Sequence, residues 1–450
     1  MQVKVSLILP SLNVAPYMEE CLKSATSQSL REIEILCVDA GSTDGTTQII
    51  RRFAAEDARI RLLHSPVRSY GRQVNLGLDQ ASGEYVAVLE TDDFVHPDMY
   101  GRLYEEAAFG SLDQVSADYD TVFRLQSGAY HLTRQCLFRG EKTDWYGAVL
   151  GTERLAALRA CDHVLWKGIY NRAFLNAHNI RLHESSGAAF QDMGFLQQTK
   201  TYVTKATYLN ESFYRYRVDR REASSANLCG LRFYEEEFRW LERGILPVLS
   251  HIHRIYYSLT MSIAFLTKYE QILAILKGAW EDERLSGPYA WFSVRLREAL
   301  ERGLLSEALY SRADWERLNL LLHGERAAHA SLIMAQQQEM ERPLRELVRL
   351  TDGCPVVIFG CGRRGEKLML ACEDSGIPIT GFCDNNPLFA GGKWNGFAVH
   401  HPTAPETIKG ESRILLSMKK GRDQARSQLL EAGVREERIA ARLAEELFQR

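Results

Sequence analysis

The chain has 450 residues, which corresponds to about two to four domains of ordinary size. Hydrophobic residues make up 45% and charged residues 25% of the sequence, a composition that excludes a disordered chain. The formal net charge is −3, so the chain lacks the basic excess with which proteins bind bulk nucleic acid, and we expect no nucleic-acid partner. Nine cysteines at irregular spacing form neither a disulfide framework nor a CxxC pair, as is usual in a reducing cytosol.

The sequence begins directly with a strand pattern over residues 5–9, without a charged and apolar leader segment. No stretch of about 20 apolar residues follows. The nearest one, 245–269, contains His251, Arg254 and Lys268, and therefore predicts a buried helix. We expect a cytoplasmic protein, with peripheral association at the inner face of the cell membrane as an open alternative.

Residues 1–120 alternate short β-rich runs with helical patterns. The expected strands are 5–9, 33–38, 60–63 and 85–89, and the expected helices between them are 15–27, 46–55 and 70–80. This alternation predicts βαβ units and a mostly parallel sheet. Because the strands are almost continuously apolar, we expect helices to cover the sheet on both faces.

The rest of the chain changes character twice. Residues 120–220 are rich in glycine, polar loops and aromatics, with a helix expected over 167–179. Residues 230–350 predict the helices 231–243, 251–277, 289–301 and 327–350. An α/β pattern then returns, with strands at 355–359, 379–383 and 413–416 and helices at 365–374 and 423–432. We therefore predict three domains, 1–225, 226–350 and 351–450.

A cluster of acids, Glu90, Asp92 and Asp93, follows the fourth predicted strand. Like charges this close together are costly unless a cation lies among them. Carboxylates are ligands of Mg²⁺ and Mn²⁺, and the carboxyl ends of strands are where open α/β sheets bind ligands. The aspartates would also suit the cap of a helix that begins near His96, so the residues alone leave both roles open.

Two further polar loops are expected at the same edge of the sheet. LPSLN (9–13) follows the first strand, and VDAGSTDGT (38–46) follows the second. Together with YGRQVNLGLDQASGEY (70–85) and LETDDF (89–94), these motifs resemble, in this order, the family 2 glycosyltransferases of the GT-A fold. The resemblance covers about the first 220 residues.

The resemblance implies an α/β fold: a GT-A (nucleotide-diphospho-sugar transferase) mixed sheet with helices on both faces. The helical patterns of residues 230–350 add a helical middle region after it. It also implies inverting transfer of a sugar from a nucleotide-diphospho-sugar to an acceptor hydroxyl, with Mg²⁺ or Mn²⁺ held by Glu90, Asp92 and Asp93. The positions that match the donor site are Pro10, Asn13, Asp39, Arg72, Asn75 and Arg217. Ala40 and Leu12 depart from the family pattern, which leaves the nucleotide open, with a UDP-sugar as the first expectation.

A second set of motifs resembles the acceptor side of one bacterial branch of this family. It consists of LWKGIYNR (165–172) and the run that ends in Gln191-Asp192. In that branch the aspartate is the general base, so the resemblance gives this role to Asp192. Capping of the following helix is the alternative role, and Glu184 is the rival base. We expect Asp192 to be exposed and to have the pKa of an ordinary aspartate.

The YRYR run (214–217) and Ser224-Ser225 resemble the segment that closes the domain near the donor phosphates. Arg215 and Arg217 are the residues that would offset the diphosphate charge, with a solvated surface position as the alternative. His178 and His183 are weaker candidates for metal ligands, because a lone histidine is more often structural.

The last region contains GCGRRG at 360–365, between a predicted strand and a predicted helix, and Asp384 ends the next strand. Glycines allow a pyrophosphate to approach the backbone, and an acid at this spacing suits a ribose hydroxyl. The candidate residues are Gly360, Gly362, Gly365 and Asp384. The region resembles the small Rossmann-like domains of sugar-modifying enzymes and of some glycosyltransferases, which leaves both ligand binding and a docking role open.

Together these patterns predict a metal-dependent glycosyltransferase of surface polysaccharide biosynthesis. We expect a glycan or lipid-linked acceptor, and assembly as a homo-oligomer is left open. Two alternatives remain. One is a nucleotide-dependent oxidoreductase or epimerase that uses the glycine-rich turn, and the other is a non-catalytic scaffold that binds a nucleotide-sugar.

Overall fold

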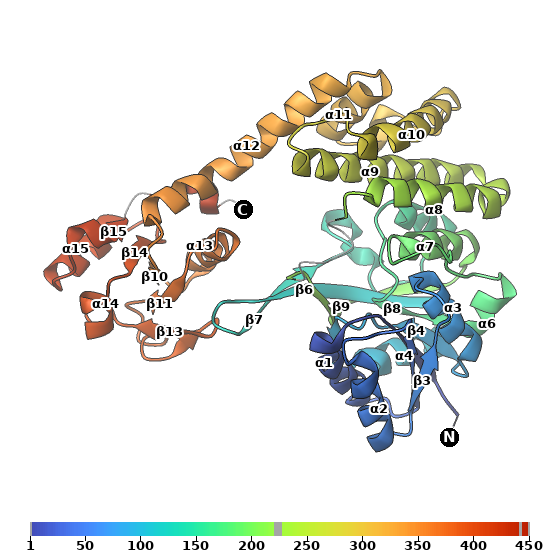
Figure 1. Ribbon diagram of the computed structural model, residues 1–450, viewed down its shortest axis with the longest axis horizontal. Helices are drawn as coiled ribbons and strands as arrows, with labels where there is room; N and C mark the ends of the chain where they lie inside the picture. The colour runs from blue at the N-terminus through green and yellow to red at the C-terminus, as the bar shows by residue number, and fades with distance from the viewer. Residues whose placement is uncertain (1, 220–226, 441–442, 449–450) are drawn as a thin grey trace. The chain divides into compact units, whose positions relative to one another are not determined.

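The computed structural model describes residues 2–219, 227–440 and 443–448. The chain divides into two compact units. The first unit comprises Met1–Val122 and Leu132–Ser331, and the second comprises Phe123–His131 and Leu332–Arg450. Figure 1 traces the elements of both units along the chain by colour.

The first unit is built on one mixed sheet with the strand order β3-β2-β1-β4-β8-β6-β9-β5, and β7 pairs with β6. The four strands β1 to β4 run parallel, and β8 is antiparallel to both of its neighbours. The bounds are β1 (Val5–Ser11), β2 (Ile33–Asp39), β3 (Ile60–His64), β4 (Tyr85–Val88), β5 (Phe94–Val95), β6 (Gln114–Arg124), β7 (Tyr130–Gln135), β8 (Gly168–Asn171) and β9 (Ala206–Arg217).

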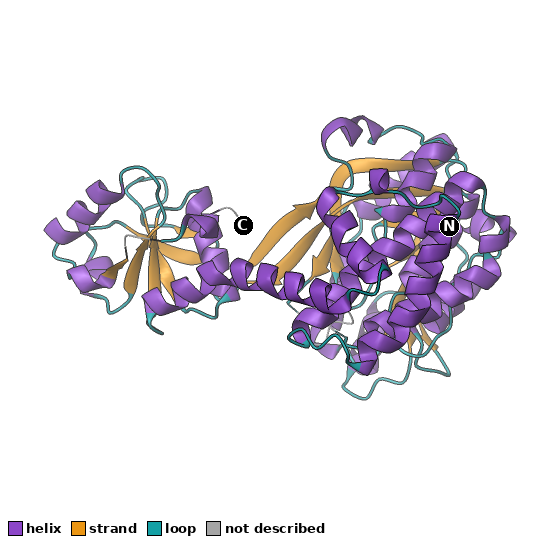
Figure 2. Ribbon diagram, turned by 90° about the horizontal axis from the view of Figure 1, so that it is seen from above, coloured by secondary structure: helices purple, strands orange, loops and turns teal. Residues whose placement is uncertain are grey.

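Helices cover both faces of this sheet, as the apolar strands predict (Figure 2). Successive side chains of β1 alternate between two buried clusters, with Leu7 and Leu9 in one and Ile8 in the other. Helices that pack into the first cluster are α1 (Ala15–Thr26), α2 (Thr46–Glu56) and α4 (Met99–Gly110). Helices that pack into the second are α3 (Tyr70–Gln80), α5 (Thr152–Ala157), α6 (Arg172–Ala177) and α7 (Gln191–Tyr202).

The segment 167–179, predicted as one helix, begins instead as the strand β8 and becomes helical only at α6. The Asn171 side chain accepts a hydrogen bond from Phe174 N at 3.0 Å and so caps α6. The prediction failed because β8 lies between β4 and β6, a long-range pairing that local propensity does not reveal.

The helical middle of the chain contains α8 (Gly230–Gly244), α9 (His251–Ile275), α10 (Glu283–Glu301), α11 (Arg312–Leu322) and α12 (Arg326–Thr351). The expected start of α10 at residue 289 is wrong, because the helix begins at Glu283, where the Asp282 side chain caps it, and continues through Pro288. The sequence also gave no indication of α11, a short helix capped by Ser311. Within the described residues, no helix is both long and apolar enough to cross a bilayer.

The second unit contains a smaller sheet with the order β12-β13-β11-β10-β14-β15, in which β10 pairs in parallel with both β11 and β14. Buried clusters lie on both faces of this sheet. The strands are β10 (Val356–Phe359), β11 (Ile379–Cys383), β12 (Lys393–Trp394), β13 (Phe397–His400), β14 (Arg413–Leu416) and β15 (Ile439–Ala440). The helices are α13 (Arg363–Asp374), α14 (Pro405–Lys409) and α15 (Arg422–Glu431).

The second unit also includes the tip of the β6–β7 hairpin, residues 123–131, which we call the hairpin tip. Leu125 is buried in the core of this unit. The Gln126 side chain donates to Ile377 O at 3.0 Å and accepts from Ile379 N at 3.0 Å, so it is hydrogen-bonded to the start of β11. The unit is therefore assembled from two stretches of sequence, and the hairpin tip is part of its core.

We expect Leu125→Ala to lower the free energy of unfolding of the second unit by about 2–5 kcal/mol, the usual cost of truncating a buried leucine. Hydrogen exchange of β10 and β11 peptides would report this loss as faster exchange. Leu132→Ala is the matched control, because its side chain is 45% exposed and belongs to the first unit. Equal protection in both variants would contradict a core role for the hairpin tip.

Candidate functional site

Three loops meet at the carboxyl edge of the parallel strands of the first unit. Asp39 ends β2 with a fully buried carboxylate, whose Oδ2 accepts from Gly41 N at 2.9 Å and from Ser42 N at 3.0 Å. Asn13, beyond the end of β1, accepts from Thr43 N through its Oδ1 at 2.9 Å. The predicted residues Asn13 and Asp39 thus lie together, and both order the loop that follows β2.

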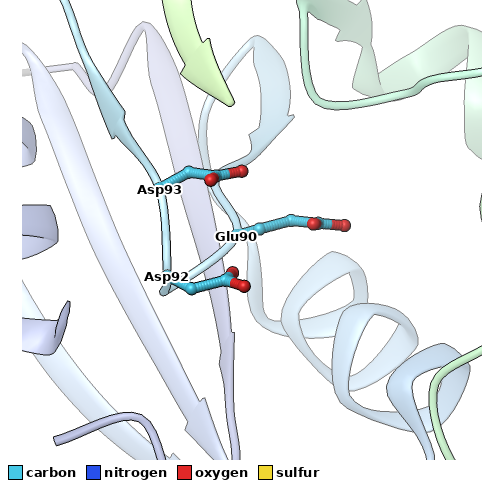
Figure 3. Close-up of side chains that lie close together, drawn as sticks. All are labelled: Glu90, Asp92 and Asp93. Atoms are coloured by element: carbon cyan, nitrogen blue, oxygen red, sulfur yellow. The ribbon is translucent and has the colours of Figure 1, made fainter. Parts of the chain in front are cut away.

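The acid cluster of Glu90, Asp92 and Asp93 lies in the loop after β4, and its side chains point into one space (Figure 3). One ligand oxygen from each carboxylate can be chosen so that all three lie within 4.8 Å of one another. Thr91 Oγ1 donates to Pro10 O at 2.8 Å, which ties this loop to the end of β1. Burial and the charges of the two neighbouring acids raise the pKa of Asp93 well above its usual range.

The donor set of this cluster fits a hard divalent cation such as Mg²⁺ or Mn²⁺, since it offers only carboxylate oxygens. Among the described residues it is the one group of three or more potential metal ligands. His178 and His183 belong to no such group. His178 stacks on Tyr202 with ring centroids 4.5 Å apart, and His183 Nδ1 lies 2.9 Å from Glu237 Oε2.

Strand β9 and helix α3 hold the acid cluster in place. Tyr214 OH donates to Asp93 Oδ2 at 2.9 Å and accepts from Glu90 N at 3.1 Å. The backbone N–H of Arg217 donates to Asp93 Oδ1 at 2.7 Å, and Tyr70 OH donates to Glu90 Oε1 at 3.1 Å. The sequence analysis did not single out Tyr70 or Tyr214, although both stand inside motifs that it quoted.

The two arginines of β9 have partners within the protein. The guanidinium of Arg217 is nearly buried, donates from Nε to Asp92 O at 2.9 Å and pairs with Glu20 at 2.8 Å. Arg215 forms an ion pair with Asp120. Arg217 therefore lies beside the acid cluster, whereas Ser224 and Ser225 fall outside the described residues.

Asp192 lies at the second position of α7, and its Oδ1 accepts from Met193 N at 2.8 Å. The preceding loop is fixed against the start of α3 by the hydrogen bonds Tyr70 N to Gly187 O (2.9 Å) and Gly187 N to Arg68 O (3.0 Å). Burial, followed by the negative charges of the acid cluster and of Asp192, raises the pKa of the Tyr70 and Tyr216 phenols. The carboxylate charges of the candidate base and of the candidate metal site therefore both affect the pKa of these two hydroxyl groups.

The expectation that Asp192 is exposed and has an ordinary pKa is wrong. Burial, with a contribution from the negative charge of Glu237, raises the pKa of Asp192 to about 7. The Ser-Ser-Gly loop suggested an open position in the sequence. The structure instead stacks Phe190, two residues earlier, on Tyr234 of α8, a contact that could not be inferred from local sequence.

Arg72 and Asn75 on α3 contact the segment that leads toward Asp192. Asn75 is buried and makes two hydrogen bonds to the backbone of Leu182, each 2.9 Å long. Its amide also donates to Glu184 Oε1 at 3.0 Å, and Arg72 lies 3.3 Å from the same oxygen. Arg72 thus forms an ion pair with Glu184, the rival base, and Asn75 adds a hydrogen bond to the same carboxylate.

In the second unit, the three glycines of the turn after β10 lie close to Asp384, which follows β11. Gly360 has a φ of 109°, and a Cβ on Gly365 would overlap Gly360 O, so both positions favour glycine. Gly362 immediately precedes α13. Asp384 Oδ2 accepts from Cys361 N at 2.7 Å, which fixes the turn from the end of β11.

Residues 6–157 match the family model "Glycosyl transferase family 2". Two similar proteins are the uncharacterized glycosyltransferase YibD of Escherichia coli K12, 28% identical over 53% of this chain and 70% of the relative, and the glycosyltransferase GlyG of Streptococcus pneumoniae, 27% identical over 47% and 70%. The crystal structure of S. aureus TarS 1–349 is similar with a TM-score of 0.55 and 17% identity over 75% of this chain and 92% of that one. A complex of the same protein with UDP-GlcNAc gives a TM-score of 0.56 and 15% identity over the same shares of the two chains.

The match covers the sheet edge and the whole acid cluster, the relatives carry the name of the activity, and the first unit has the GT-A fold. Residues 6–157 therefore form a family 2 glycosyltransferase domain, and the chain is a glycosyltransferase.

Proposed function

We propose that the chain transfers a sugar, with inversion, from a nucleotide-diphospho-sugar to an acceptor hydroxyl at the acid cluster and Asp192. The observation that carries this proposal is the shared position of two groups of carboxylates. The acid cluster converges at the sheet edge, and Tyr70 links it to the loop before Asp192, because its OH donates to Glu90 Oε1 at 3.1 Å and its backbone N–H donates to Gly187 O at 2.9 Å. Inverting transfer needs these two centres: one for the leaving diphosphate and one for the incoming hydroxyl.

In this proposal the acid cluster holds Mg²⁺ or Mn²⁺, which would stabilise the charge that develops on the departing nucleoside diphosphate. Pro10, Asn13 and Asp39 shape the loops that receive the nucleotide, and Arg217 adds positive charge beside the acids. A UDP-sugar is the first donor to test, because TarS, which shares the fold, has been crystallised with UDP-GlcNAc.

Asp192 in its ionised form takes the proton of the acceptor hydroxyl as that oxygen bonds to the sugar. A pKa of about 7 suits this task, because a base is most effective when its pKa lies near the working pH. Arg72 and Asn75 support the acceptor side by fixing the segment before Asp192. The acceptor is a glycan or a lipid-linked sugar of surface polysaccharide synthesis, presented at the cytoplasmic side of the membrane.

We expect Asp92→Asn to reduce the Mn²⁺-dependent release of nucleoside diphosphate from UDP-sugars by about two orders of magnitude or more, since charge stabilisation by a metal is worth several kcal/mol. Asp92 is preferred to Asp93, whose carboxylate also holds Tyr214 and the backbone of β9. Asp98→Asn, with 56% of its side chain exposed, controls for charge in the same segment. Full metal-dependent turnover in Asp92→Asn would refute the metal site.

We expect Asp192→Asn to lower transfer by about 10²–10⁴-fold with donor affinity unchanged, because it removes the proton acceptor and keeps the shape. In the wild type, kcat/KM should fall about tenfold per pH unit below pH 7, where Asp192 becomes protonated. Glu184→Gln is the matched variant and should be milder, because Arg72 and Asn75 engage Glu184. An inactive Glu184→Gln with an active Asp192→Asn would move the base to Glu184.

We also propose that the second unit, as a Rossmann-like domain, binds a phosphate-containing ligand such as a nucleotide or nucleotide-sugar at Gly360, Gly362, Gly365 and Asp384. The supporting observation is topological. The chain passes from β10 to β11 and β13 on one side of β10 and then crosses to β14 on the other side, and such switch points are ligand sites in open α/β sheets. Exposed cations lie nearby in the sequence: Arg363 begins α13, and Lys419 and Lys420 follow β14.

A nucleoside diphosphate at about 100 times its dissociation constant should raise the free energy of unfolding of the second unit by about 2.7 kcal/mol. Calorimetry with UDP, ADP and NAD would measure this, and Lys419→Ala/Lys420→Ala should weaken it. Lys393→Ala, on the edge strand β12, is the control. No stabilisation by any of the three would leave a docking role for this unit.

A further inference from the structure

Helix α8 lines one side of the segment that carries Asp192. Its residues Tyr234, Glu237 and Trp240 are spaced by three along the helix. Tyr234 stacks on Phe190 with ring centroids 3.9 Å apart, and Trp240 stacks on His183 at 5.0 Å. Two aromatic contacts thus hold the segment on either side of Glu237.

Glu237 is an unusual residue for this position because its side chain is almost fully buried. Its Oε2 lies 2.9 Å from His183 Nδ1, but its Oε1 has no hydrogen-bond partner among the described residues. That oxygen instead lies against Gly194, where a Cβ would overlap it. A buried polar atom without a partner is costly, so a role beyond packing is expected of this carboxylate.

Gly194 follows Asp192 by two residues in the first turn of α7. If Glu237 moves, Gly194 can shift with it, and the backbone of Asp192, two residues away, would shift as well. We propose that Glu237 is a positioning residue for Asp192: held by His183 and pressed against Gly194, it fixes the first turn of α7 and with it the carboxylate of Asp192. This inference rests on the proposed function of Asp192 as the base.

The groups that face Asp192 come from several elements. They are Glu237 and Tyr234 of α8, Tyr70 of α3, Tyr170 of β8 and Tyr216 of β9, with His183 on the neighbouring loop and Lys268 of α9 over the Phe190 ring. Glu237 is the carboxylate among them, and its charge adds to burial in raising the pKa of Asp192. Removal of that charge should therefore lower the pKa of Asp192, which a merely structural role would not do.

The test is Glu237→Gln, which keeps the shape and removes the charge. We expect the acid limb of the kcat/KM profile to move to lower pH and kcat on its plateau to fall on the order of tenfold, with the donor KM unchanged, because small displacements of a base cost rate rather than donor binding. Glu236→Gln is the matched control on the same helix, since Glu236 pairs with Arg232 at 3.1 Å on an exposed face, and it should leave both values unchanged.

A second pair of variants tests the contact itself. Gly194→Ala should abolish most transfer, because the new methyl group displaces Glu237 or α7. Glu237→Asp in the same chain shortens the acid by one methylene and should restore part of the activity, as coupled residues in contact do. If the double variant is no better than Gly194→Ala alone, the contact does not carry the effect.

Carboxyl-carbon NMR of labelled aspartate separates this inference from the proposed function. The signal absent in Asp192→Asn identifies Asp192, and its midpoint can be followed without any donor. A midpoint that moves down in Glu237→Gln and stays in Glu236→Gln supports the inference. A midpoint and an acid limb that do not move overturn it, even where Glu237→Gln is less stable. A wild-type chain that turns over no nucleotide-sugar overturns the proposed function, and the positioning role for catalysis with it.

Discussion

The repulsion among the three carboxylates after β4 is the constraint on which the first unit depends. Three acids in one small space are unstable unless hydrogen bonds and a cation compensate them. The protein provides the hydrogen bonds from both sides of the sheet edge, through Tyr70 of α3 and Tyr214 of β9. The pairing of β9 with β6 and β5 at the far side of the sheet therefore has a direct chemical purpose, because it brings Tyr214 and the backbone of Arg217 to Asp93.

Helix α7 must likewise hold a carboxylate, that of Asp192, in a fixed position. Its first turn carries Asp192, and its far end is anchored by buried cations. Lys200 Nζ lies 3.0 Å from Asp162 Oδ2 and donates to Tyr208 OH at 2.6 Å. Arg159 donates to the carbonyl oxygen of Gln197 at 3.0 Å. Positive charge near a helix C-terminus is favourable, so α7 is fixed at the end opposite its functional residue and leaves its N-terminus for chemistry.

Much of this structure could be predicted from the sequence because its strands and its acid cluster are each formed by residues that are neighbours in the chain. The strands β11 and β14 have the predicted bounds, since each is a short apolar run between turn residues. The acid cluster could be predicted because its three members lie within four residues of one another. Glu237 could not, because it stands in a run of charges that reads as a solvated helix face. Its position along the helix could have indicated burial, because Glu237 lies on the same face of α8 as the apolar residues Leu231, Phe238 and Leu241, which are buried.

The environment of Asp192 was equally beyond the sequence, since the stacking of the nearby Phe190 on Tyr234 depends on how α8 packs. The partners of the predicted donor residues were hidden for the same reason. Asn75 and Leu182 are separated by 107 positions in sequence, yet their polar atoms satisfy one another. Residue type and motif indicated which side chains gather at the site. Only the packing of distant segments shows which of their polar atoms already have hydrogen-bond partners.

The hairpin tip has a consequence for the order of events during synthesis. Gln126 bonds to a residue 253 positions later, so the tip leaves the ribosome long before its partners exist. At translation rates of about 5–20 residues per second, Leu125 stays without its core for a time on the order of tens of seconds. The first unit can begin to form in that interval, while the second must wait for the end of the chain. Long-range closure of this kind slows folding and keeps an apolar side chain accessible to chaperones.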